Sequence, residues 1–148
     1  MTKRLLALAM VFCLAFPQQG QSMHKKKKSK SATNQATQTL EGTWELTYIE
    51  GGEFSKLYKG KIPQITFDLK KNSVNGNNGC NSFFGTAHIA GNKIGFDGLG
   101  STKIFCPGDG ERLFMDALAK ISTYAISAPG EVDFISGDIG LMHFKKIK

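Results

Sequence analysis

The fold class of this chain is decided by one stretch, Asp109-Gly-Glu-Arg-Leu-Phe-Met-Asp-Ala-Leu-Ala-Lys-Ile-Ser122. Its apolar side chains recur at helical spacing, and they are Leu113, Phe114, Ala117, Leu118 and Ile121. Asp109 suits the N-cap, and Glu111 suits the positive first turn. The stretch therefore predicts one amphipathic helix over about 109–122, whose apolar stripe needs a sheet face to cover.

Short segments with the alternation of strands lie on both sides of this predicted helix. They are 43–49 with Trp44, Leu46 and Tyr48 on one face, 65–69, a short strand near Val74, 86–90 and 93–96 around a Gly91-Asn92 turn, 101–106, a strand from Tyr124, and a hairpin of 132–135 and 139–145. The segment 75–79 is a glycine-rich loop. We expect an α+β fold, a curved antiparallel sheet or incomplete β-barrel of about eight short strands with the helix packed on it.

The positive charge of the chain is concentrated near its N-terminus. The formal net charge is +7, from 19 Lys and Arg against 12 Asp and Glu. Seven of the basic residues precede Glu41: Lys3, Arg4, and the cluster Lys25, Lys26, Lys27, Lys28 and Lys30. Subtracting these seven from 19 leaves 12 basic residues against 12 acidic ones. A neutral domain has no broad footprint for a phosphate backbone, so we expect no nucleic-acid partner.

The first 22 residues have the pattern of a secretory signal peptide. A short basic segment precedes an apolar run over 5–16, and Gly20-Gln-Ser22 offers small residues ahead of a cleavage site before Met23. The run is too short to cross a bilayer as a stable helix. Lipidation at Cys13 is the rival interpretation, and we disfavour it because Phe12 stands where the peptidase prefers a small residue. We expect an exported protein, in the periplasm or associated with the outer membrane or cell surface.

Residues 23–40 are polar and show no apolar periodicity. Such a segment buries too little surface to offset its ordering entropy, so it predicts a disordered linker rich in lysine. The lysines between Lys25 and Lys30 could contact anionic lipid or cell-wall polymers peripherally, at about 1 kcal/mol per lysine. A simple soluble tether is the interpretation that we favour. The folded domain is then expected over 41–148.

Three short motifs inside this domain carry a resemblance to a known family. They are Asn78-Gly79-Cys80-Asn81 with Gly85, then Thr102-Lys103 with Cys106, and Glu111 at the start of the helix. Together they resemble the META domain of HslJ-like proteins, which typically show G-C-N-x-x-x-G, T-(R/K)-x-x-C and an acidic residue that opens a helix. Trp44 and Phe144 also fall where that family has its first and last strands, so the resemblance spans about residues 41–147.

The resemblance implies an exported envelope protein without an established enzymatic activity, cofactor or ligand. Family members are commonly secreted or attached to the outer membrane, and some are associated with heat or antibiotic stress. Seven residues are expected to matter, for structure or for binding: Gly79, Cys80, Asn81, Gly85, Thr102, Cys106 and Glu111. This chain departs from the lipoprotein members because it lacks a convincing lipobox.

Cys80 and Cys106 are the pair left after removal of a signal peptide, and an even number suits an oxidising compartment. Three interpretations stay open. The pair forms a disulfide, which we favour, or both thiols are free and buried, or one thiol is a nucleophile with His88 or His143 as its base. Neither cysteine lies in a recognisable nucleophile motif, so we expect no catalytic residues.

Other candidate sites are weaker. The spacing of Cys80, Cys106, His88 and His143 is not that of a metal site, so we expect no metal. The 75–81 loop lacks the G-K-[ST] of a phosphate cradle, and Asn81 is interpreted as a loop organiser. Five phenylalanines could form core or line an apolar pocket, and we favour core: Phe83, Phe84, Phe96, Phe105 and Phe114.

The sequence thus predicts a non-catalytic exported envelope protein with a structural or binding role, in a stress-related setting. Its partner would be another envelope component. The alternatives are a binder of a small apolar ligand or lipid, and a cysteine-dependent enzyme, which the missing motifs disfavour.

Overall fold

The computed structural model describes residues 39–148. The predicted signal peptide (1–22), the lipidation candidate Cys13 and nearly all of the predicted linker lie outside the described residues. Leu40, the last residue assigned to that linker, is buried, and its carbonyl accepts a hydrogen bond of 2.8 Å from Trp44 Nε1. The folded domain therefore begins slightly earlier than expected.

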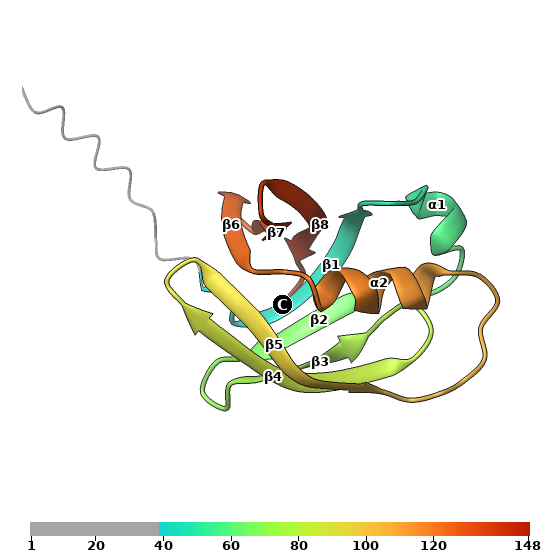
Figure 1. Ribbon diagram of the computed structural model, residues 1–148, viewed down its shortest axis with the longest axis horizontal. Coiled ribbons are helices and arrows are strands. Elements are labelled where there is room, and N and C mark those ends of the chain that lie inside the picture. Colours follow the sequence, from blue (N-terminus) through green and yellow to red (C-terminus); the bar gives the residue numbers. More distant parts are fainter. Residues whose placement is uncertain (1–38) are drawn as a thin grey trace, which may run out of the picture. The chain divides into compact units, whose positions relative to one another are not determined.

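Eight antiparallel strands form a ring (Figure 1). They are β1 (Gly42–Ile49), β2 (Gln64–Asp68), β3 (Ser73–Asn77), β4 (Ser82–Ala90), β5 (Lys93–Ser101), β6 (Thr123–Ala128), β7 (Glu131–Ser136) and β8 (Ile139–Lys146). Each strand pairs with its neighbour in sequence, and β8 returns to pair with β1. This arrangement confirms the predicted curved antiparallel sheet.

The ring is irregular at one seam. β5 and β6 share a single register pair, Lys93 with Thr123, whereas the other neighbouring strands pair over at least four positions. The chain between β5 and β6 carries the helix α2 (Gly110–Leu118). Few ladder hydrogen bonds therefore join the two sides of the ring at this seam (Figure 1).

The helix packs into the ring through its apolar stripe, as predicted. Phe114 and Leu118 are fully buried, and the Phe114 ring lies 5.5 Å from Phe83 and 6.4 Å from Phe144. Phe134 continues this chain of rings, at 5.2 Å from Phe144 and 6.1 Å from Phe67. Interlocked aromatic side chains thus fill the interior of the ring, in arrangements that add to their area burial.

Helix content differs from the prediction in two ways. The helix expected over 109–122 ends at Leu118, because the chain turns there to reach β6. A second helix, α1 (Phe54–Leu57), is only one turn long and follows β1. Asp109 precedes α2, but its side chain makes no capping hydrogen bond. It pairs with Arg112 at 3.3 Å instead.

Three local predictions are wrong. The segment 101–106 is a strand only at Ser101, and beyond it the chain is irregular, because its backbone groups bond side chains of another loop. The glycine-rich segment 75–79 is partly strand, since β3 runs to Asn77. In β1 a bulge between Leu46 and Tyr48 reverses the alternation, so Tyr48 is 46% exposed and Ile49 is buried.

Candidate functional site

The three motifs, far apart in sequence, meet at one corner of the ring. The first follows β3 as a tight loop over 78–81, the second follows β5, and the third opens α2. The irregular segment after β5 returns past the 78–81 loop, and Thr102 N–H donates to the Ser82 carbonyl at 3.0 Å. We call this corner the motif corner.

Asn81 is the centre of the motif corner. Its side chain is 1% exposed, and its Oδ1 accepts hydrogen bonds from Thr102 Oγ1 and from the Ile104 N–H, both at 2.7 Å. Its Nδ2 donates to the Ile104 carbonyl and to Glu111 Oε2, both at 2.9 Å. One amide therefore joins all three motifs, which is the geometry expected of a loop organiser.

Asn78 and Glu111 complete the network. The fully buried Asn78 accepts at Oδ1 from the backbone N–H of Asn81 at 2.7 Å and of Cys80 at 3.2 Å. Its Nδ2 donates to Glu111 Oε1 at 3.1 Å. Both carboxyl oxygens of Glu111 thus accept from asparagines, and no buried side-chain polar atom among the described residues lacks a partner. Polar groups satisfied in this way stabilise a fold.

Cys80 and Cys106 form a disulfide across the same corner, with their Cα atoms 6.1 Å apart. The structure therefore contains the disulfide, which was the favoured of the three interpretations. His88 and His143, the candidate bases, lie elsewhere. His88 Nε2 pairs with Asp97 at 2.9 Å, and His143 Nδ1 contacts Asp133 Oδ1 at 2.6 Å.

Steric contacts explain why two positions of the motifs are glycine. Gly79 has a φ of +94°, and a Cβ there would lie 2.7 Å from the ring of Tyr58. Gly85 stands where the register between β4 and β5 shifts, and a Cβ there would lie 2.9 Å from Leu99 Cδ2. Each glycine therefore permits a close approach that a side chain would block.

Tyr58 was not predicted from the sequence, although it closes the motif corner from the side of α1. Its hydroxyl donates to the Gly110 carbonyl at 2.8 Å, and burial raises the pKa of the phenol well above its usual value. No local pattern identifies this tyrosine, because it meets α2 only through the path of the chain after α1. Asn78 belongs to a motif that the sequence shows, but its contact with Glu111 could not be predicted because the two residues are 33 positions apart.

A hollow beside the disulfide is too small for a substrate. Its volume is about 30 Å³, enough for about one water molecule, and Tyr58, Gly79, Cys106 and Glu111 are among its lining residues. Residues 39–148 also contain no group of three or more His, Cys, Asp or Glu placed to hold a metal ion. In the same range, no helix has the length and apolar character needed to span a membrane.

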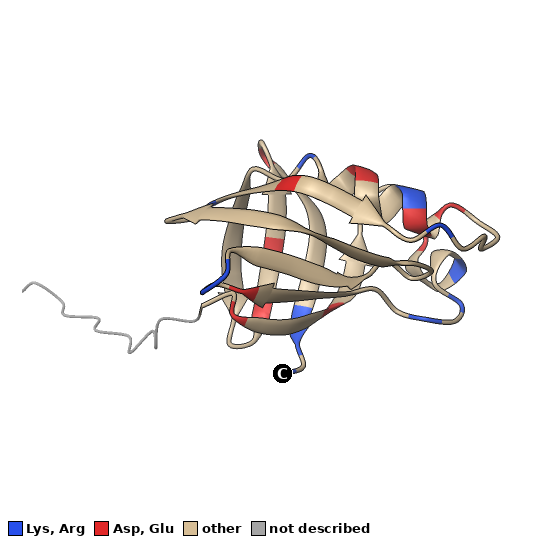
Figure 2. Cartoon of the chain, turned by 90° about the horizontal axis from the view of Figure 1, so that it is seen from below, with Lys and Arg blue, Asp and Glu red and all other residues tan. Residues whose placement is uncertain are grey.

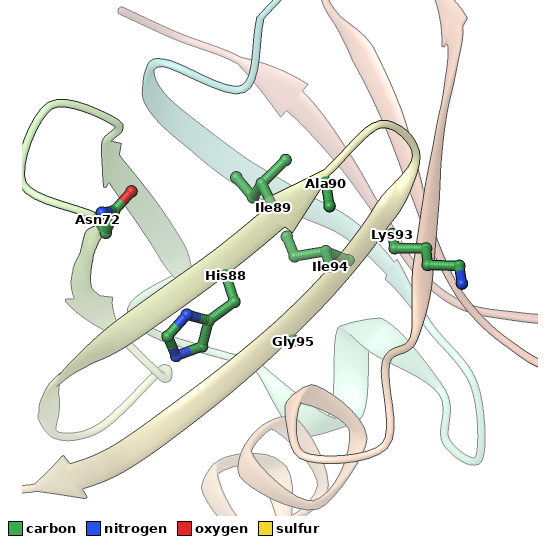
Figure 3. Close-up of a pocket in the computed structure, with 7 residues that line it drawn as sticks. All are labelled: Asn72, His88, Ile89, Ala90, Lys93, Ile94 and Gly95. Carbon is green, nitrogen blue, oxygen red and sulfur yellow. The ribbon is translucent and has the colours of Figure 1, made fainter.

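A larger, shallow hollow of about 520 Å³ lies on the β4–β5 hairpin (Figure 3). Gly95 is one of its lining residues, and a Cβ there would meet nothing within 4 Å. His88 and Lys93 line it but point away from one another in Figure 3. The hollow therefore lacks the convergent polar groups that mark a small-molecule site.

The five phenylalanines divide between core and surface. Phe83 and Phe114 are buried, and Phe96 packs against the core, as the favoured interpretation predicted. Phe84 lies on the outer face, 62% exposed, with its ring over Gly100. Phe105 is 90% exposed. The core prediction is therefore wrong for these last two, and neither lines either of the two hollows described above.

Comparison with known proteins agrees with the geometry. The sequence profile of the META domain matches residues 37–138. None of the curated proteins compared with the chain matches it significantly.

Solved structures show the same fold. A protein from Burkholderia xenovorans, determined by NMR, is 20% identical with a TM-score of 0.58, over 73% of this chain and 83% of that one. A second NMR structure is 16% identical with a TM-score of 0.55, over 72% and 89%. A crystal structure of a DUF4847 family protein from Bacteroides vulgatus is 18% identical with a TM-score of 0.52, over 74% and 94%. At these identities the likeness is one of fold.

Proposed function

The chain belongs to the META domain family, and we propose that it is a non-catalytic protein of the bacterial cell envelope that acts through its structure and by binding. The observation that carries this proposal is that the polar side chains of the motif corner all have hydrogen-bond partners. Asn78, Asn81 and Glu111 bond one another and the backbone, and the two cysteines are joined. Groups committed in this way stabilise the fold, and they leave no thiolate at this corner to serve as a nucleophile.

Export is supported by two independent features. The N-terminal sequence has the basic and apolar segments of a secretory signal. The Cys80–Cys106 disulfide suits an oxidising compartment, because cytosolic thiols are kept reduced. The association of some family members with heat or antibiotic stress favours a stress-related setting.

The packed interior favours a partner on the outside of the ring over an apolar ligand inside it. Trp44, Phe67 and Phe134 are fully buried, and the phenylalanine rings there are in contact. A ligand inside would have to displace these side chains, which costs several kcal/mol for each aromatic residue removed from its packing. Binding to another envelope component through the outer surface requires no such rearrangement.

Fractionation of bacteria that express the full chain tests the proposal. We expect the protein in the envelope or periplasmic fraction, shortened at its N-terminus. The variant Leu8→Arg places a charge inside the apolar run and should remain full length in the cytoplasm. A control, Ile139→Arg, places the same charge at an exposed apolar position of the domain and leaves the signal intact.

Equal cytoplasmic amounts of the wild type and Leu8→Arg would contradict export. Purified domain that turns over an acyl, thioester or disulfide substrate, with the turnover lost on alkylation after reduction, would contradict the non-catalytic part of the proposal.

A further inference from the structure

Two large apolar side chains project into solvent next to the motif corner. Ile104 is 66% exposed, and Phe105, at 90%, is the most exposed large hydrophobic residue among 39–148. We call this pair the apolar tip. Isolated exposed apolar residues are common on protein surfaces, but two adjacent ones of this size on a loop indicate a contact surface.

The protein holds the apolar tip rigidly. The backbone N–H and carbonyl of Ile104 both bond the buried Asn81 side chain, at 2.7 and 2.9 Å. Cys106, directly after Phe105, is tied to Cys80. Both ends of the tip are therefore fixed without any packing of the apolar side chains themselves, so docking them costs little conformational entropy.

Exposed lysines without an ion-pair partner lie on chain segments near the apolar tip. Lys59, Lys61 and Lys103 are exposed and form no ion pair with any described residue. Lys61 lies on the segment beside the 78–81 loop, since its carbonyl oxygen is 3.4 Å from the position of a Cβ on Gly79. Figure 2 shows basic residues on the loops that project from this end of the ring.

Two exposed acidic residues at the same end of the ring form ion pairs. Glu53 pairs with Lys56 at 2.6 Å, and Asp109 pairs with Arg112 at 3.3 Å. Glu111 accepts from the two asparagines of the motif corner. The three lysines are therefore basic groups near the apolar tip that no carboxylate pairs with, although the charges of the domain sum to zero.

We propose that the apolar tip docks on the surface of a bilayer that contains anionic phospholipid. Phe105 and Ile104 insert at the level of the headgroups, and the three lysines face lipid phosphates. Apolar groups flanked by lysines are the combination that binds such interfaces. The hollow beside the tip holds about one water molecule, which is too little to receive a side chain of a protein partner.

This inference names a partner for the envelope protein proposed above and rests on that proposal only for access to a membrane. Its test is sedimentation of the full chain with vesicles of phosphatidylcholine mixed with phosphatidylglycerol, and of phosphatidylcholine alone. We expect binding to the mixed vesicles and much weaker binding to the neutral ones. Phe105→Ala should weaken binding to the mixed vesicles about tenfold, and Lys103→Gln about fivefold.

Ile147→Ala is the matched control, because Ile147 is also exposed and lies between two lysines, beside Thr43 at the start of β1. It should change the affinity less than about twofold if the apolar tip is the docking site. Every variant keeps Lys25–Lys30, so any binding through that cluster is the same in all of them.

Insertion has a direct optical test, because the chain has one tryptophan, Trp44, and it is buried. In Phe105→Trp, the indole introduced at position 105 should shift its emission to the blue with mixed vesicles and be quenched by brominated lipid. No binding, or equal binding by wild type and Phe105→Ala with no quenching, would overturn the proposal. Vesicle binding is independent of export, so a cytoplasmic location in cells would overturn only the proposed function.

Discussion

At the scale of single residues, one buried asparagine connects all three motifs. Asn81 exchanges hydrogen bonds with Thr102, Ile104 and Glu111, which lie 21 to 30 residues away in the sequence. Removal of such a side chain leaves its buried partners without a hydrogen bond. An unsatisfied buried group destabilises the fold by more free energy than the hydrogen bond itself contributes. The motif is therefore a device for fixing chain segments to one another.

Asn81→Ala should lower the free energy of unfolding by about 2–4 kcal/mol, because the Ile104 N–H and a Glu111 oxygen lose their partner. Asn75→Ala is the control, since Asn75 is an exposed residue of β3 and its loss should cost less than about 0.5 kcal/mol. Urea unfolding followed by tryptophan fluorescence measures both. Similar midpoints for the two variants would contradict the role of Asn81.

Tyr58 gives a prediction for pH dependence. Burial raises the pKa of its phenol from the ordinary value of 10.0. Because the folded pKa lies above the unfolded one, the contribution of Tyr58 is complete below about pH 10 and declines as the pH rises further.

Tyr58→Phe should therefore lose about 1 kcal/mol at neutral pH, with its hydrogen bond to Gly110, but should weaken less than wild type above about pH 10. Urea unfolding of both proteins between about pH 8 and pH 11 measures the difference. The titration of lysines is common to the two and cancels. Parallel stability curves across this range would show that the phenol is not effectively buried.

At the scale of elements, alternation and periodicity predicted most of the sheet and the core face of the helix. They failed where a long-range partner decides the local structure. The segment 101–106 has the alternation of a strand, but Asn81 and the Cys80–Cys106 bridge hold it in an irregular path. In β1 the bulge before Tyr48 left no mark on the pattern of apolar residues.

The residues of the candidate site also divide into those that a sequence pattern identifies and those that only long-range contacts place. The motif residues were found from the sequence because they form a recognisable pattern. Their partner Tyr58 was not, since it reaches the motif corner only through the path of the chain after α1. The exposure of Phe105 was also missed, because a phenylalanine beside a strand pattern favours burial.

Close pairing of β2 and β3 predicts a steric effect. A Cβ on Gly76 would lie 2.0 Å from the Gln64 carbonyl oxygen, whereas one on Gly95 of β5 would meet nothing. Gly76→Ala should therefore cost at least about 2 kcal/mol, and Gly95→Ala less than about 0.5 kcal/mol. Thermal unfolding of the two variants measures this. Equal costs would show that the β2–β3 pair is looser than its register implies.

At the scale of the whole molecule, the ring of strands and the helix enclose an interior filled by aromatic rings. The motif corner lies at the edge of this core and fixes the irregular segment after β5, which the sheet does not hold. Family membership, the disulfide and the N-terminal sequence together favour a stable module for an oxidising compartment, with its binding surface outside the ring.

The central claim is that the chain works as an exported protein with its motif cysteines joined. Its most direct test is the intact mass of the protein isolated from its native host, before and after reduction and alkylation. We predict a chain that begins near Met23, with Cys80 and Cys106 alkylated only after reduction. A chain that begins at Met1, with both thiols alkylated before reduction, would contradict the claim and revive a cysteine-dependent activity.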